Sequence, residues 1–439
     1  MSKEKKAKNP QRRKKLKKAL FITFAIILCI DVVTTIANIC VVSSNVKIAG
    51  NYEKIDYNGN QLVPEKDENG NWVFTTDEDF KVVQLTDIHL GGGYMSKGKD
   101  EMAMRAVASM LTTEKPDLVV VTGDIAYPVP FQAGTFNNKS GAKQFITLME
   151  TLGVYWTVNF GNHDTEAYSY YDRESISDLY SDESLKYCLY QPGPDEVDGF
   201  GNHTIEVKNS NGIITQALVM LDSHSYTDGD FLGIFWKYDN IHQNQVDWYK
   251  SEIQRMNKEN TNALKANNVE EGSEAWKNFS TVKSLCFFHI PLVEARDTWL
   301  ELEANGFKDT DTAKYVDGII GEQGTRIYCG IGEDELFETM VEMNSTKAMF
   351  NGHDHYNNAT FSKNDIIFSY GYSIDYLAYS GIKEEGSQRG CTVITCKPDA
   401  SFEIDKYNYY SDRYADNGFQ KEEVTMQFED VTYQVPLEE

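Results

Sequence analysis

Cysteine and histidine are both scarce in this chain of 439 residues, which has seven cysteines and eight histidines. Two of the cysteines, Cys29 and Cys40, fall in an apolar run near the N-terminus, and the other five show no spacing typical of a disulfide framework. A small fold built on disulfides is therefore excluded, although one or two isolated bridges remain open. A chain of this length can instead bury a large hydrophobic core, in one large domain or two smaller ones.

Basic residues are scarce outside the first 18 residues. The whole chain has 42 Lys and Arg against 67 Asp and Glu, a net charge of −25. Residues 1–18 contain ten of the basic residues and one Glu, so this segment has a net charge of +9 and the rest of the chain has −34. Nucleic-acid binding depends on neutralising phosphates, so this acidic body predicts no nucleic-acid partner. The acidity is equally compatible with cation binding, an extracellular domain or simple solubility.

Long apolar runs are absent except for ALFITFAIILCIDVVTTIANICVV at residues 19–42. This run is long enough to cross a hydrocarbon core of about 30 Å, and the basic residues before it predict that residues 1–18 stay in the cytosol. Because the run continues past Asp31, we expect residues 19–43 to be an uncleaved signal anchor of a single-pass membrane protein. The alternative is a cleaved signal peptide with its apolar core at 19–30 and Thr35 and Ala37 near the cut. Either way, the body is expected in the extracellular space or a lumen.

A polar stem with entry strands, residues 44–80, is expected between this segment and a body at residues 81–439. Five Asn-x-Ser/Thr sequons fit a glycoprotein, although a chain rich in these residues acquires about this many by chance. The sequons begin at Asn138, Asn202, Asn278, Asn344 and Asn358. The oligomeric state does not follow from the sequence.

The body begins with alternating strands and helices. Short apolar runs rich in β-branched residues predict strands at 80–87, 117–124 and 154–164, and the segments 99–117 and 140–153 between them predict helices ended near Pro116 and Gly153. Further strands are predicted at 215–223, 284–290, 347–355 and 365–371. Residues 243–280 are expected to form a surface helix and a linker, and residues 300–335 an irregular insert. Continuous apolar strands separated by helices are typical of an α/β fold with covered sheets.

Polar side chains that can bind a metal follow five of the predicted strands, and five of the eight histidines are among them. Ligands of open α/β sheets bind at the carboxyl ends of the strands, so these side chains are expected to meet at one place. Imidazole and carboxylate together suit Zn, Fe or Mn, and neighbouring glycines would let the backbone approach a compact cluster. The residues are Asp87, His89, Asp124, Asn162, His163, Asp164, His289, His353 and His355.

Seven of these residues, all except His163 and Asp164, would suffice for two metals that share one carboxylate. Such a pair can hold both the attacking and the leaving oxygen during displacement at phosphorus. Any one of these motifs alone is more often structural, and the prediction depends on their order and their common placement at strand ends.

In this order, Asp-x-His, Gly-Asp, Gly-Asn-His-Asp, His and Gly-x-His-x-His resemble the calcineurin-like metallophosphoesterase superfamily over residues 82–370. The segments LDSHSY at 221–226 and QNQVDWY at 243–249 resemble its purple acid phosphatase-like branch. The resemblance implies an α/β fold (α+β in some schemes), a two-sheet β-sandwich flanked by helices with a dimetal site at the carboxyl ends of the strands. Residues 81–439 would then be the catalytic domain.

The resemblance also implies roles for the site residues. One metal would be bound by Asp87, His89, Asp124 and His355, and the other by Asp124, Asn162, His289 and His353. A hydroxide bridging the two metals would attack phosphorus. His163 would donate a proton to the leaving group or stabilise the phosphoryl oxygens, oriented by Asp164.

One departure concerns Tyr127, which follows the Gly-Asp aspartate by three residues. Members with a purple ferric site use a Tyr at this place and lack the His of Asp-x-His, whereas this chain has both Tyr127 and His89. We expect His89 to be the ligand and Tyr127 to pack nearby. A pocket role for His224 and a phosphate contact by Arg173 stay open beside structural roles.

The expected function is hydrolysis of a phosphate ester by a phosphomonoesterase similar to acid phosphatases, with its body outside the cytosol. Two alternatives remain: a phosphodiesterase or nucleotidase with the same metal core, and a membrane-tethered binding protein that keeps the fold without catalysis.

Overall fold

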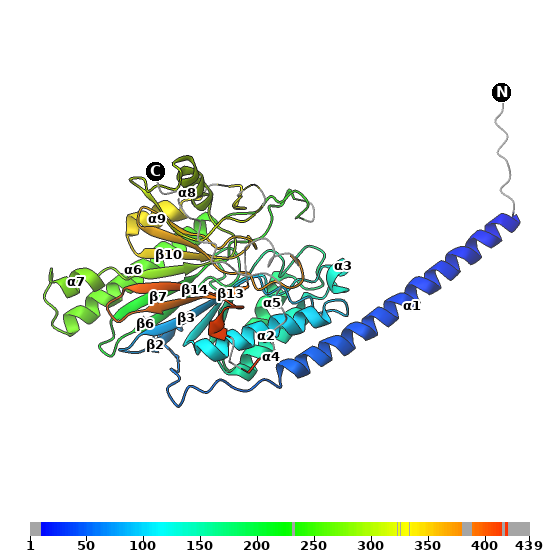
Figure 1. Cartoon of the computed structure of the whole chain (residues 1–439), viewed down its shortest axis with the longest axis horizontal. Helices are drawn as coiled ribbons and strands as arrows, with labels where there is room; N and C mark the ends of the chain where they lie inside the picture. The colour runs from blue at the N-terminus through cyan, green and yellow to red at the C-terminus, as the bar shows by residue number, and fades with distance from the viewer. Residues whose placement is uncertain are drawn as a thin grey trace, which may run out of the picture.

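The computed structural model describes residues 10–230, 233–322, 324, 326–332, 334–379, 389–414 and 418–419. Two sheets form the centre of the molecule (Figure 1). The smaller has five strands, in which β3, β4 and β5 run parallel and β13 pairs antiparallel with β3 and β14. Their order across the sheet is β14 (Phe402–Asn408), β13 (Gly390–Cys396), β3 (Phe80–Leu85), β4 (Leu118–Thr122) and β5 (Trp156–Asn159).

The larger sheet has nine strands, and its central strands β7, β8, β10 and β12 run parallel. Across the sheet the order is β1 (Glu65–Lys66), β2 (Trp72–Thr75), β6 (His203–Lys208), β7 (Ile214–Met220), β8 (Ser284–Phe287), β10 (Thr346–Asn351), β12 (Ile366–Tyr370), β11 (Thr360–Lys363) and β9 (Ala313–Asp317). Each of the seven predicted strands is present, as β3, β4, β5, β7, β8, β10 and β12.

The core lies on both faces of the larger sheet. In and just after β8, Leu285 and Phe287 belong to a hydrophobic cluster shared with the smaller sheet, whereas Cys286 and Phe288 belong to a second cluster. Successive side chains of a strand point to opposite faces, so the continuous apolar run of β8 fills both clusters. The ring of Phe287 stacks on that of Phe350 from β10, with centroids 5.0 Å apart.

Helices cover the outer faces of the two sheets, which confirms the predicted sandwich flanked by helices. α2 (Lys97–Glu114) and α4 (Asn138–Leu152) contribute to the cluster shared with the smaller sheet, while α6 (Gln243–Ala266), α8 (Val293–Ala304) and α9 (Leu336–Met343) contribute to the second. The shorter helices are α3 (Pro130–Ala133), α5 (Arg173–Tyr180), α7 (Glu274–Phe279) and η2 (Asp412–Tyr414). All seven cysteines are unpaired, in agreement with a fold not built on disulfides.

The sequence prediction missed several elements. The segment 300–335, predicted as an irregular insert, contains the end of α8 and the edge strand β9, whose side chains are mostly exposed and therefore carry no continuous apolar signal. β6, β11, β13 and β14 were also not predicted. They pair antiparallel with a neighbouring strand and do not follow the strand-helix alternation from which the other strands were predicted.

The N-terminal helix α1 (Pro10–Ala49) projects from the body along most of its length (Figure 1). Its residues 14–49 contain an apolar stretch that is long enough to cross a membrane, by length and composition. The last turns of α1 contact α2 and α4. There the buried side chain of Asn45 donates to Gln144 Oε1 at 3.1 Å and to the carbonyl of Lys97 at 3.3 Å. The helix is therefore joined to the body by polar contacts at its C-terminal end.

Candidate metal centre

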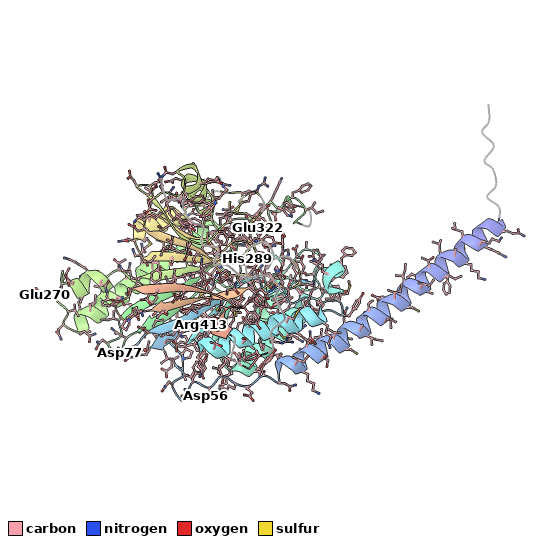
Figure 2. The ribbon with its side chains drawn as sticks, in the orientation of Figure 1. Asp56, Asp77, Glu270, His289, Glu322 and Arg413 are labelled. Carbon is pink, nitrogen blue, oxygen red and sulfur yellow. The ribbon has the colours of Figure 1, made fainter. Side chains whose placement is uncertain are left out.

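The seven residues predicted as metal ligands meet in the interior, at the carboxyl ends of three parallel strands of the smaller sheet and two parallel strands of the larger one. All seven are buried. Asp87 and His89 follow β3, Asp124 follows β4, Asn162 follows β5, His289 follows β8, and His353 and His355 follow β10. Figure 2 shows His289 near the middle of the body.

Four of these residues form one tight group. Asp87, His89, Asp124 and His355 each offer one nitrogen or oxygen atom, and these atoms lie within 4.8 Å of one another. His89 Nε2 lies 3.3 Å from Asp124 Oδ2, and His355 Nε2 lies 3.3 Å from Asp87 Oδ1. Two carboxylates and two imidazoles thus face a common point.

A second group adjoins the first through Asp124. Asp124 Oδ2, which faces His89, also lies 3.2 Å from His289 Nε2. Asn162 Oδ1 lies 3.2 Å from His289 Nε2 and 2.9 Å from His353 Nδ1. One carboxylate oxygen is therefore placed between the two groups, as a ligand shared by two ions would be.

The backbone of the strand-end loops is strained at the residues that carry these side chains. Asp87, His89, Asp124 and His353 have φ values of 50°, 53°, 55° and 76°, in the left-handed region that residues other than Gly seldom adopt. Such strain persists only where the surroundings impose it, and it concentrates at functional sites.

Two glycines of the motifs are needed for the close approach of the loops. A Cβ atom at Gly161 would lie 2.1 Å from Asp124 Oδ1, and one at Gly352 would lie 1.9 Å from Thr86 Oγ1. Neither position can accept a larger residue without moving the loops. The expectation that neighbouring glycines allow a compact cluster is confirmed at these two positions.

The electrostatics of the cluster favour a bound cation. Burial alone would lower the pKa of His89, but the carboxylates of Asp375 and Asp124 outweigh it and raise that pKa to about 9. Burial alone would also lower the pKa of His289, but the Asp124 carboxylate outweighs this effect and raises that pKa to about 9. The buried carboxylates thus draw positive charge onto their neighbours, and a metal ion would provide that charge. Carboxylate, imidazole and amide oxygen together fit transition metals.

Asp375 is a functional candidate that the sequence motifs did not include. Its carboxylate is fully buried, with Oδ1 3.3 Å from His89 Nδ1 and Oδ2 3.6 Å from His355 Nδ1. Carboxylates behind ligand imidazoles fix the orientation of the rings. Asp375 follows the predicted strand 365–371 by four residues, without a motif that would distinguish it from other aspartates.

The predicted pairing of His163 with Asp164 is wrong. The Asp164 carboxylate instead accepts hydrogen bonds from the backbone N–H groups of Asp124, Ala126 and Gly161, each at 2.9 Å. It therefore holds the loops of Asp124, Ala126 and Gly161 together. Burial and the nearby Asp124 carboxylate raise the pKa of Asp164 to about 6.

Glu166 is the carboxylate that faces His163, with Oε1 2.7 Å from His163 Nδ1. The segment NHDTE contains both acids, and the sequence alone gave no reason to prefer the one three residues away. The side chain of His163 is 22% exposed, so its ring reaches solvent while Glu166 stays buried.

Tyr127 packs against the cluster and directs its hydroxyl away from it. Its ring centroid lies 4.7 Å from that of His89 and 4.8 Å from that of His163, while its hydroxyl donates to Gln132 Oε1 at 2.9 Å. Burial and the nearby carboxylate of Asp375 raise the pKa of the Tyr127 phenol. These contacts agree with a packing role for Tyr127.

Arg173 and His224 have structural partners. Arg173 begins α5 and donates to Asp222 Oδ1 at 2.5 Å and to the carbonyl of Gly161 at 3.0 Å. His224 Nε2 lies 2.8 Å from Gln245 Oε1, and its ring stacks on His242. Arg173 thus supports the loop that carries Asn162 and His163.

A cavity of about 250 Å³ opens beside the cluster, and aromatic side chains form most of its wall. Two carboxylates also face it, and none of the described lining residues is Lys or Arg. The lining comprises Tyr127, His163, Tyr226, Trp236, Tyr238, Glu322, Tyr328, His353, Asp354, His355 and Tyr379. Figure 2 shows Glu322 in the same central region as His289.

Comparison with known proteins places this geometry in a family. Residues 80–357 match the calcineurin-like phosphoesterases. Probable inactive purple acid phosphatase 28 of Arabidopsis thaliana is 25% identical over 350 residues, covering 74% of this chain and 78% of that protein. Phosphatase DCR2 of Saccharomyces cerevisiae is 27% identical over 303 residues, covering 64% of this chain and 45% of that protein.

Among solved structures, a dimetal phosphatase from Danio rerio is similar with a TM-score of 0.46 at 10% identity, covering 76% of this chain and 97% of that one. The family match alone spans well over half of the chain and includes all seven candidate ligands. The chain therefore belongs to the calcineurin-like phosphoesterases.

Proposed function

We propose that the protein is a metal-dependent phosphomonoesterase that resembles acid phosphatases and uses two transition metal ions, Fe, Mn or Zn. The observation that carries this proposal is the position of Asp124 Oδ2, 3.3 Å from His89 Nε2 on one side and 3.2 Å from His289 Nε2 on the other. A shared carboxylate between two donor groups is the arrangement that a dimetal centre requires.

The residues divide into the two ligand groups described above. Asp87, His89, Asp124 and His355 would bind one ion, and Asp124, Asn162, His289 and His353 the other. When bound, the two ions would supply Lewis-acid stabilisation of the phosphoryl oxygens and a nucleophilic water at neutral pH.

His163 is the proposed proton donor to the leaving oxygen. Since Nδ1 faces Glu166, Nε2 is the nitrogen left to face a substrate in the cavity. Glu166 holds the ring in that orientation, and Tyr226, whose hydroxyl donates to Glu166 Oε1 at 3.3 Å, holds Glu166 in turn.

Catalysis is proposed in spite of the names of three relatives from Arabidopsis thaliana, which are called probable inactive purple acid phosphatases. A chain that kept the fold only for binding would be free to lose a ligand or the proton donor. This chain retains seven buried donors and a partly exposed imidazole at one place.

The test is a hydrolysis panel of aryl phosphate monoesters and diesters after chelation, with Mn, Fe and Zn restored one at a time. We expect metal-dependent hydrolysis in which monoesters are preferred. Hydrolysis of diesters or nucleotides alone would replace the proposal with the phosphodiesterase or nucleotidase alternative. Less than one transition metal bound per chain and no hydrolysis would favour the binding protein.

We also propose that α1 is an uncleaved signal anchor and that the body lies outside the cytosol. The helix runs without interruption through Thr35 and Ala37, the residues near the alternative cut, and its end packs on the body. Cleavage would separate this packed end from the apolar run before it. Mass spectrometry of the protein extracted from membranes would find the intact N-terminus if the proposal is right.

Glycosylation of such a body would be restricted to two of the five sequons. Asn138, Asn202 and Asn358 are buried, and their side chains cannot carry a glycan in this fold. Asn344 is exposed and Asn278 is half-buried. If the wild-type protein loses mass on glycosidase treatment, a variant with both residues replaced by Gln should lose none.

A further inference from the structure

One side chain of the apolar run joins the membrane helix to the loops beside the cavity. Asn38 Nδ2 donates to the carbonyl of Gly134 at 3.0 Å, and the backbone N–H of Tyr94 donates to Asn38 Oδ1 at 2.8 Å. Both polar groups of Asn38 are therefore satisfied by the body. An Asn side chain in the hydrocarbon core costs free energy, and this cost is avoided if Asn38 stands at the membrane boundary.

The length of the helix sets that boundary. From Lys18, the last residue of the basic tail, to Asn38 there are 20 residues, and at 1.5 Å per residue these span about 30 Å, the thickness of the hydrocarbon core. With Lys18 at the cytosolic face, Asn38 stands at the opposite face. The loops bonded to Asn38 then lie at the same level, in the headgroup region of the outer leaflet.

These loops expose apolar side chains at that level. Phe131 on α3 is 88% exposed, the largest value for a large hydrophobic residue in the described part of the body. Tyr94 and Met95 are 42% and 49% exposed, and Phe136 is 37% exposed. Figure 1 shows α3 on the side of the body that faces α1. Tyr is enriched at membrane interfaces, and Phe is among the residues that interfacial segments bury there.

Tyr94, Met95, Phe131 and Phe136, here called the rim, come from two loops that contact each other. The backbone N–H of Met95 donates to the carbonyl of Ala133 at 3.1 Å. A Cβ at Gly134 would lie 2.6 Å from the Tyr94 ring and 3.0 Å from Met95. The two loops are thus packed on each other and would enter an interface as a unit.

The rim is continuous with the wall of the cavity. Gln132, next to Phe131, accepts the hydroxyl of Tyr127 at 2.9 Å and donates to the carbonyl of Leu377 at 3.3 Å. Tyr127 lines the cavity, and Leu377 lies two residues from Tyr379, which also lines it. A molecule held in the headgroup region next to α3 would therefore lie at the entrance of the site.

We propose that the rim rests on the outer leaflet and that the centre hydrolyses phosphate monoesters of lipid alcohols presented there. This deepens the proposed function and rests on it. Water would add to phosphorus, the bond from phosphorus to the lipid oxygen would break, and His163 would protonate that oxygen. The products are a lipid alcohol and inorganic phosphate. Because the body is acidic, it is not attracted to anionic lipid. Apolar contact is therefore the force that holds the rim in place.

The position of the rim is tested by depth-dependent quenching, with no need for activity. In the full chain carrying C29S and C40S, F131C is labelled with an environment-sensitive fluorophore and reconstituted in phosphatidylcholine vesicles that contain a quencher lipid. The matched control is L300C on α8, where Leu300 is 48% exposed. Figure 1 shows α8 across the body from α1. We expect strong quenching at 131 and little at 300. Equal quenching at both positions would overturn the placement of the rim.

The substrate class is tested with dioleoyl phosphatidic acid in phosphatidylcholine vesicles against soluble p-nitrophenyl phosphate. Replacing Phe131 and Met95 with Ser should lower hydrolysis of the lipid about tenfold, because apolar burial in the interface is lost, and should leave the soluble ester unchanged. L300S should change neither rate. An equal loss on both substrates, or no loss on the lipid, would overturn the proposal. If the wild-type protein hydrolyses neither substrate, the proposed function fails, whereas the quenching result stands independently.

Discussion

The buried centre and the surface cluster of His224, Asp239 and His242 contain the same kinds of side chain in different surroundings. In each, the nitrogen and oxygen atoms lie within 4.8 Å of one another. The four residues of the buried group are fully buried, whereas the three cluster residues are only partly buried. Left-handed backbone occurs in both, at Asp87, His89 and Asp124 in the buried group and at His224 in the surface cluster.

The partners of the two histidine sets differ as well. In the surface cluster the rings of His224 and His242 stack with centroids 4.1 Å apart and an angle of 19° between their planes. His242 Nδ1 lies 2.7 Å from Asp198, and His224 Nε2 lies 2.8 Å from Gln245. Ordinary hydrogen bonds satisfy these rings. Burial, and not composition or spacing, therefore distinguishes the candidate metal centre from the surface cluster.

The largest expected effect comes from Asp124, the carboxylate between the two donor groups. Replacing it with Asn should lower hydrolysis of an aryl phosphate by about 10³-fold or more, since a shared negative ligand is lost from both ion sites. The matched change in the surface cluster, Asp239→Asn, should leave the rate within about twofold of wild type. Metal content by elemental analysis should fall only in the first variant. Equal losses of hydrolysis in both variants would mean that the buried group and the surface cluster do not differ in function.

A smaller loss is expected from His163→Asn, about 10²-fold in kcat with the metal content unchanged, because a proton donor is removed but no ligand. The loss should be greater for esters of alkyl alcohols than for nitrophenyl esters, which need little protonation of the leaving oxygen. His242→Asn is the control from the surface cluster. A loss independent of the leaving group would assign His163 to the phosphoryl oxygens instead.

Next in size is the effect of the carboxylate behind the ligand rings. Asp375→Asn should weaken metal binding about 10- to 100-fold, measured by competition with a chelator, and excess metal should restore the rate. Asp198, which lies behind His242 in the same way, provides the control, and Asp198→Asn should not alter metal binding. An unchanged affinity in Asp375→Asn would show that the ligand rings are held by packing alone.

The sequence predicted that the candidate ligands follow the ends of strands, because that position depends on local pattern. A short apolar run followed by Asp, His or Asn identifies both the strand and the polar residue that follows its end. Gly161, which approaches Asp124, and Gly352, which approaches Asp87, belong to the same motifs. Asp375 and Glu166 could not be predicted in this way. Their roles depend on how the loops after β12 and β5 return to the centre, and that path is set by tertiary packing and not by local pattern.

The smallest expected effect concerns stability and contrasts two histidines outside the centre. Burial between the sheets lowers the pKa of His203 from 6.5 to about 4, and its ring nitrogens lie 2.8 Å from Thr157 Oγ1 and from the carbonyl of Gly201. The neutral ring therefore contributes stability that is complete above pH 6.5 and is lost as the pH falls toward 4, up to about 3 kcal/mol.

Urea unfolding at several pH values checks this contribution. In His203→Gln the loss of unfolding free energy between pH 6.5 and 4 should be smaller than in wild type by that amount. His242, whose pKa is raised by the carboxylates of Asp198 and Asp239 against the effect of burial, has the opposite sign. Its contribution is present below pH 6.5 and declines as the pH rises, so His242→Gln should retain the acid loss. The same acid loss in both variants would contradict a buried neutral His203.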